Sequence, residues 1–220
     1  MKNIIPILFL LVLSACSTTK KIVDKPVIFN DERTELTLNY LKERYGLDQK
    51  EPTIVPKMIV LHWTAIPTFE KSFDAFHDSK LPNWRPDIET VSGLNVSAHF
   101  LVDRDGTIYR LLTETTMGRH VIGLNHCAIG VENVGGTSET PLTKEQLKSN
   151  IWLVKYLAEK YDIAYVIGHH EYTLFEGHEL WLEKDKGYRT KKTDPGEEFM
   201  TKVRNATKEY KFKPLPKNSN

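Results

Sequence analysis

The stretch Met58-Ile59-Val60-Leu61-His62-Trp63-Thr64-Ala65 decides how the rest of the chain is interpreted. Four consecutive apolar residues are typical of a strand that is buried on both faces, and such strands end at a cleft. The strand is predicted to stop at His62, which places an imidazole at its edge. A second apolar run, Ala164-Tyr165-Val166-Ile167-Gly168, ends in the same way on His169. The sequence therefore predicts two buried strands that each present a histidine.

A carboxylate that could join these histidines follows in Lys192-Thr193-Asp194-Pro195-Gly196. Two histidines and one carboxylate can bind a catalytic zinc ion and leave its fourth position to water. We take His62, His169 and Asp194 as candidate zinc ligands. The alternative is that Asp194 caps a helix whose first residue is Pro195.

Length and charge restrict the class of protein. The 220 residues are 40% hydrophobic and 27% charged, which suits one globular domain with a single core. The formal net charge is +1, and removal of an N-terminal segment with Lys2 would make it zero. A chain without a basic field is a poor partner for nucleic acid, so we expect none.

The N-terminus predicts export. Residues 1–15 combine Lys2, an apolar run and a small-residue cleavage site, which is the pattern of a signal peptide. Leu13-Ser14-Ala15-Cys16 resembles the bacterial lipobox, so we expect Cys16 to be lipidated and residues 16–29 to serve as anchor and tether. Ordinary secretion after cleavage near Ala15 is the alternative. Cys127 would then be the remaining cysteine, which excludes an intramolecular disulfide.

Helix and strand patterns alternate along residues 30–211, which we assign to one domain. We expect an α/β fold in which a mixed central sheet is flanked by helices. Asp105-Gly106 joins two strands, 96–103 and 107–111, in a hairpin. Helices are expected over about 30–45, from Thr68 onward, after the capping box at Thr143, and over about 196–210. Residues 172–190 should form a long loop that could line a cleft, and residues 212–220 a flexible tail.

Glu132 lies on a further predicted strand, Ala128 to Asn133. Ile129 and Val131 alternate with Ala128, Gly130 and Glu132, so the two sets face opposite sides of the sheet. A glutamate between small residues could form the floor of a cleft. A solvated carboxylate at a sheet edge would give the same pattern.

The order of these motifs resembles one enzyme family. His62 after an apolar strand, Val-Ser-Ala-His-Phe with Asp105-Gly106, Ala-Ile-Gly-Val-Glu132, Gly-His169 and Lys-Thr-Asp194-Pro-Gly follow one another as in the zinc-dependent N-acetylmuramoyl-L-alanine amidases. That family shares its fold with phage T7 lysozyme and the peptidoglycan recognition proteins. The resemblance covers about residues 55–205.

The resemblance implies a role for each matched residue. His62, His169 and Asp194 would bind zinc, Glu132 would transfer protons, and Lys192 would stabilise the developing oxyanion. His120 matches a histidine that contacts substrate in the family, although Arg119 precedes it here where the family often has tryptophan. The segment between His169 and Asp194 is longer than in the family.

These observations together predict a lipid-anchored amidase of the bacterial cell envelope. Its substrate would be peptidoglycan or muropeptides, cut between N-acetylmuramic acid and L-alanine of the stem peptide. We expect a monomer, held at the periplasmic side of the outer membrane if the cell has one. The alternatives are a peptidoglycan-recognition module without catalysis and a zinc hydrolase that cuts another amide bond of the wall.

Overall fold

One six-stranded mixed sheet forms the framework of the protein. The structure is a computed structural model that describes residues 21–82 and 91–217, so the predicted signal peptide and Cys16 lie outside the described residues. The strands, in sheet order, are β1 (Ile22–Asp24), β4 (Ile108–Arg110), β3 (Phe100–Val102), β5 (Ala128–Asn133), β2 (Met58–Leu61) and β6 (Tyr165–Gly168). Among these neighbours β3 and β4 are antiparallel, and the other four pairs are parallel. The predicted mixed sheet is confirmed.

Three of the described α-helices begin at a residue whose side chain caps the helix. The helices and helical turns are α1 (Asp31–Tyr40), a π-helical turn (Leu41–Tyr45), α2 (Phe69–His77), α4 (Lys144–Lys160), α5 (Glu197–Ala206) and two 3₁₀ turns (His169–Phe175 and Lys208–Tyr210). Asn30, Thr68 and Thr143 each accept a hydrogen bond from the backbone N–H three residues later. None of the helices within residues 21–82 and 91–217 combines the length and apolar character needed to cross a membrane.

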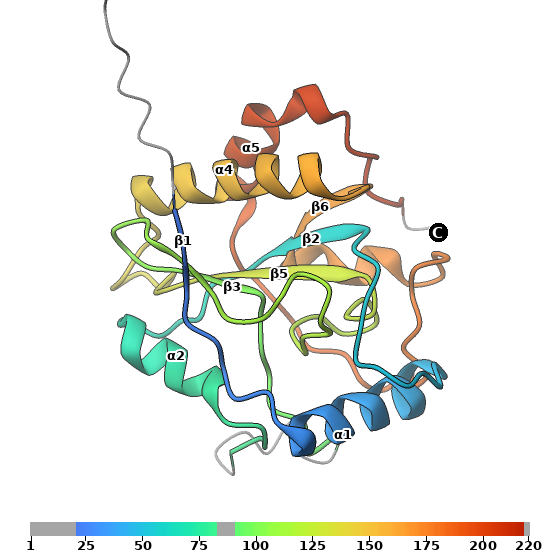
Figure 1. The fold of residues 1–220 in the computed structure, drawn as a ribbon. Coiled ribbons are helices and arrows are strands. Elements are labelled where there is room, and N and C mark those ends of the chain that lie inside the picture. Colours follow the sequence, from blue (N-terminus) through green and yellow to red (C-terminus); the bar gives the residue numbers. More distant parts are fainter. Residues whose placement is uncertain (1–20, 83–90, 218–220) are drawn as a thin grey trace, which may run out of the picture.

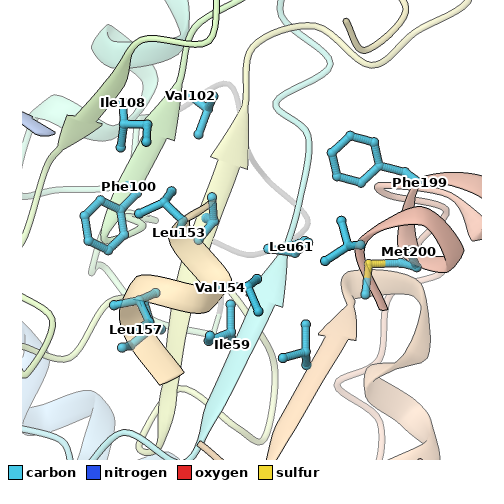
Figure 2. Close-up of a cluster of buried hydrophobic side chains, with 14 residues drawn as sticks. Ile59, Leu61, Phe100, Val102, Ile108, Leu153, Val154, Leu157, Phe199 and Met200 are labelled. Atoms are coloured by element: carbon cyan, nitrogen blue, oxygen red, sulfur yellow. The ribbon is translucent and has the colours of Figure 1, made fainter. Parts of the chain in front are cut away.

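The helices cover the two faces of the sheet (Figure 1). In that view α4 and α5 lie on one side of the sheet, and α1 and α2 lie on the other. Figure 2 shows the core below α4 and α5, where Leu153, Val154 and Met200 meet Ile59 and Leu61 of β2. All five side chains are buried, so the central strands are covered on this face and held in a fixed register.

The buried face of α4 is partly polar. Leu147 and Ile151 are partly buried, whereas the polar residues Gln146, Ser149 and Asn150 are fully buried. Gln146 donates to two backbone carbonyls and Ser149 to a third, while Asn150 exchanges hydrogen bonds with a side-chain amide on β5. These hydrogen bonds satisfy the buried polar groups, so the face of α4 that packs on the sheet can contain both polar and apolar side chains.

Both ends of the predicted domain extend farther than the sequence indicated. β1 pairs in parallel with β4, and Val27 joins the core, so residues 22–29 belong to the folded body and not to a free tether. At the other end Phe212 packs on the core and the backbone N–H of Lys213 donates to the carbonyl of Ala164. The prediction of a flexible tail from residue 212 is therefore wrong for residues 212–213.

The long segment after β6 packs against the N-terminal helical region. Arg44 forms a 2.6 Å ion pair with Glu183, whose side chain is fully buried. The guanidinium of Arg44 also lies over the ring of Tyr188, 5.0 Å from its centroid. Trp181 packs so closely on Gly123 that a Cβ there would lie 2.7 Å from the indole. The segment is thus fixed on both sides.

Candidate active site

Strand register brings three of the predicted site residues to one level. Leu61 of β2 pairs with Val131 of β5 and with Gly168 of β6, and all three strands run parallel. The residues that directly follow these three in the chain are His62, Glu132 and His169, respectively. These side chains therefore gather where β2 and β6 end, at the carboxyl edge at which open α/β sheets bind ligands.

Asp194 reaches the same place from the segment before α5. The backbone N–H and the Nδ1 of His170 both bond to the Asp194 carbonyl, at 3.0 and 2.9 Å. Helix α5 begins after Gly196, which offers no side-chain cap. The Asp194 carboxylate instead lies 3.0 Å from Nδ1 of His169. The interpretation of Asp194 as a helix cap is wrong, and His170 holds the backbone of this segment.

Three potential ligand atoms converge at this edge. Nδ1 of His62 lies 2.9 Å from Nδ1 of His169 and 3.3 Å from Oδ2 of Asp194. All three residues are buried, and their ligand atoms lie within 4.8 Å of one another. Ligands about 2.0–2.1 Å from a tetrahedral zinc ion are about 3.3 Å apart, so this donor set fits zinc in both chemistry and spacing.

The electrostatics of the cluster also favour a cation. Burial lowers the pKa of His169 to about 3, and His62 adds to the effect. Burial acts in the opposite sense on Asp194, but the neighbouring His169 and His62 outweigh it and hold the pKa of that carboxyl well below its usual range. A neutral imidazole and an ionised carboxylate are the protonation states that a metal requires.

A cavity of about 390 Å³ opens over these residues. Glu132, Lys192, His120 and Asp194 line it together with His169. A second cavity, of about 110 Å³, shares His120, His169 and Lys192 with the first and is also lined by residues of the long segment. The structure thus brings His120, Glu132, His169, Lys192 and Asp194 to one cleft, and the buried His62 lies against His120, His169 and Asp194.

Tyr188 and Thr190 are the residues by which the long segment lines the smaller cavity. The prediction that residues 172–190 form a wall of the cleft is therefore confirmed. Its first part is the 3₁₀ turn His169–Phe175 and not an irregular loop.

Four other histidines lie outside the ligand cluster. His99 is fully buried; its Nε2 donates to the carbonyl of Thr116 and its Nδ1 accepts from the N–H of Gly130. The remaining three are partly buried, and they are His77, His126 and His178.

Two residues next to the site were not anticipated. Gly130 was noted as small, but an ideal Cβ there would lie 2.7 Å from Cγ of His120, so glycine is needed for the ring to approach β5. Asn125 accepts hydrogen bonds from the N–H groups of His120 and Val121 through Oδ1. A single asparagine between Leu124 and His126 carries no local signal for this role, because the two amides reach it only through the folded loop.

The sequence profile of the N-acetylmuramoyl-L-alanine amidase family matches residues 49–197. The chain belongs to this family. The family region contains all the ligand candidates and both Glu132 and Lys192, and it ends where α5 begins. The family resemblance inferred from the order of motifs is therefore confirmed.

Individual relatives support the same assignment. The chain is 37% identical over 86 residues to an endolysin of Escherichia phage T7 and 35% identical over 86 residues to an endolysin of Enterobacteria phage T3. Each match covers 36% of this chain and 55% of the relative, so the chain spans about half the length of these phage proteins. The solved structure of an N-acetylmuramoyl-L-alanine amidase, LysC from Clostridium intestinale URNW, aligns with a TM-score of 0.54 at 22% identity. That alignment covers 89% of this chain and all of LysC, and it shows a shared fold.

Proposed function

We propose that this chain is a zinc-dependent amidase that hydrolyses the bond between N-acetylmuramic acid and L-alanine of the peptidoglycan stem peptide. The observation that carries the proposal is the convergence of His62, His169 and Asp194 beside Glu132 and Lys192, in one cavity of a chain that belongs to the amidase family. Members of such a fold that only recognise peptidoglycan need no complete ligand set, so the complete set favours catalysis.

His62, His169 and Asp194 would hold the metal through Nδ1, Nδ1 and Oδ2. A zinc ion bound there would supply a Lewis acid for the scissile carbonyl and lower the pKa of its water to about 7. The protein contributes by fixing these three atoms before the metal arrives. Asp194 is held through the two bonds from His170 to its carbonyl.

Glu132 is proposed as the group that transfers protons. Its carboxylate lies on β5 beside the level of His62 and lines the larger cavity. It can accept a proton from the attacking water and then donate one to the leaving amide nitrogen, which cannot depart as an anion. A positioned acid–base group of this kind contributes about 10²–10⁴ to the rate.

Lys192 is proposed as the group that stabilises negative charge on the carbonyl oxygen. It lines both cavities and lies two residues before Asp194, so its side chain is available to a substrate bound beside the ligand cluster. A charge that is already positioned costs no reorganisation during the reaction. Loss of one such donor costs about 10²–10³ in rate in comparable sites.

The cellular setting follows from the N-terminal sequence. The lipobox-like residues before Cys16 support a lipoprotein of the cell envelope, on the periplasmic side of the outer membrane if the cell has one. Peptidoglycan or its muropeptide fragments are the partners that this setting supplies, and His120 is a candidate contact for them because it lines both cavities.

The decisive experiment incubates the purified full-length chain, in detergent, with isolated peptidoglycan and identifies the released products by mass spectrometry. Free stem peptides that begin with L-alanine, abolished by a chelator and restored by zinc, are the expected result. Binding without products would replace the proposal by a recognition module. Products cut elsewhere in the stem peptide would reassign the substrate bond.

A further inference from the structure

His120 is bonded through both of its ring nitrogens. Its Nδ1 lies 3.1 Å from Nε2 of His62, and its Nε2 lies 3.1 Å from the carbonyl oxygen of Ala128. The ring of His120 stands edge-on to that of His62, with centroids 5.1 Å apart. His120 therefore touches the nitrogen of His62 that faces away from the ligand cluster.

The Ala128 carbonyl determines which atom donates in each of the two hydrogen bonds of His120. A carbonyl oxygen only accepts, so Nε2 of His120 carries the proton that it donates to Ala128. In the neutral ring Nδ1 of His120 is then an acceptor, and the proton between the two rings belongs to Nε2 of His62. His62 is left with a lone pair on Nδ1, the nitrogen that faces His169 and Asp194.

We propose that His120 is a positioning residue that sets the tautomer and ring orientation of the metal ligand His62. This inference rests on the proposed zinc site and adds a residue that contacts no metal. Outer partners of this kind change metal affinity by about 10–100-fold in other proteins. The backbone carbonyl of Ala128 is the fixed point, because it belongs to β5 and cannot reverse its role.

The fold holds the His120 ring in place from two sides. Gly130 leaves the space that the ring occupies on β5, where a Cβ would lie 2.7 Å from Cγ. Asn125 fixes the backbone by accepting from the N–H of His120 at 2.8 Å, and it donates in turn to the hydroxyl of Tyr45 at 2.9 Å. The position of His120 is therefore set by β5 and by the helical region that ends at Tyr45.

A contact between His120 and substrate would require a change in the hydrogen-bond partners of its ring. Each ring nitrogen of His120 already has a partner in the protein, so a polar contact with substrate would have to displace His62 or Ala128. A substrate role would appear in KM, whereas a positioning role would appear in zinc affinity without any substrate present. The two roles are separable by measurement.

The experiment compares zinc affinity of the full-length chain with that of His120→Leu and His120→Asn, by competition with a chromogenic chelator. Leucine removes the acceptor, while asparagine keeps an acceptor near the position of Nδ1. We expect about 10–100-fold weaker binding for His120→Leu and a smaller loss for His120→Asn. His126→Leu is the matched control, since His126 lies on the same loop and outside the cavities, and it should bind zinc as the wild type does.

A second measurement does not depend on any variant. Long-range ¹H–¹⁵N spectra of the metal-free wild-type chain should show His62 protonated on Nε2, with slow exchange of that proton. A proton on Nδ1, or unchanged zinc affinity in His120→Leu, would overturn the inference. Failure of the wild-type chain to bind zinc would instead overturn the proposed function, so the two failures are distinguishable.

Discussion

The carboxylate of Asp194 and that of Glu132 lie in the same cavity but in different surroundings. Asp194 is within 3.0 Å of His169 and 3.3 Å of His62, so it belongs to the ligand cluster. Glu132 lies on β5 at the level of His62 and is not a member of that cluster. Two carboxylates in such different environments are suited to different tasks, one holding the metal and the other moving protons.

This difference predicts different consequences of removing each carboxylate. Asp194→Ala should lose tightly bound zinc and hydrolysis together, because it removes a ligand. Glu132→Gln should retain zinc while hydrolysis falls by about 10²–10⁴, because it removes only the proton-transfer group. Zinc content by atomic absorption and product release by mass spectrometry separate the two. Full activity in Glu132→Gln would exclude the proposed role of Glu132.

At the scale of the elements, the sequence predicted best where a local pattern was sufficient. The capping box at Thr143 located α4, and Asp105-Gly106 located the hairpin, in which Gly106 has a φ of 86°. Glycine is suited to such a turn because it adopts positive φ without steric cost. β1 was not foreseen, because three residues that pair only with a distant strand have no periodicity of their own.

The candidate site was predictable for a related reason. His62 and His169 each follow an apolar strand, and the order of motifs supplied Asp194, Glu132 and Lys192. The polar face of α4 and the role of Asn125 were not predictable, because their hydrogen-bond partners lie on other elements. Sequence patterns report which residues end a strand, whereas packing alone decides which buried polar groups find partners.

The ion pair between Arg44 and Glu183 predicts how the long segment responds to mutation. Glu183→Gln should lower the free energy of unfolding by about 1–3 kcal/mol, since it removes the buried carboxylate that pairs with Arg44 and leaves the more exposed Asp185, 3.4 Å away, as its charged partner. Residues 176–190 should also exchange amide hydrogen faster. The control is Glu198→Gln, which breaks the exposed pair with Lys202 and should change stability by less than about 1 kcal/mol. Equal effects of the two substitutions would contradict the proposed role of the ion pair between Arg44 and Glu183.

Two histidines outside the ligand cluster, the buried His99 and the partly buried His126, make the stability of the whole molecule depend on pH. Burial lowers the pKa of His99 and of His126 to about 4, against an ordinary value of 6.5. The unfolded chain therefore binds these protons at a higher pH than the folded chain does. By linkage, their stabilising contribution is complete above about pH 6.5 and is lost as the pH falls toward 4.

Urea unfolding of the metal-stripped chain at several pH values tests this expectation. The free energy of unfolding should decrease from pH 6.5 to pH 4 in the wild type. His126→Leu should show a smaller decrease over the same interval, because it removes one of the titrating groups. A pH dependence identical to that of the wild type would show that His126 does not contribute.

The proposed lipid anchor predicts where the whole molecule is found in the cell. Cys16→Ser should release the protein from the membrane fraction, because it removes the site of acylation at Cys16. Fractionation followed by immunoblotting measures the change. Persistent membrane association of the variant, with unprocessed residues 1–15, would contradict the lipobox interpretation.

The pairing of β1 with β4 limits how far such an anchored enzyme can work. The sheet begins at Ile22, so six residue steps separate Cys16 from the folded body. Fully extended, they span about 20 Å. With the lipid in place, the catalytic cleft would reach only peptidoglycan that lies close to the membrane. Its encounters with substrate would then depend on lateral diffusion of the anchored protein in the membrane. A longer segment between Cys16 and Ile22 would extend the distance from the membrane at which it can hydrolyse its substrate.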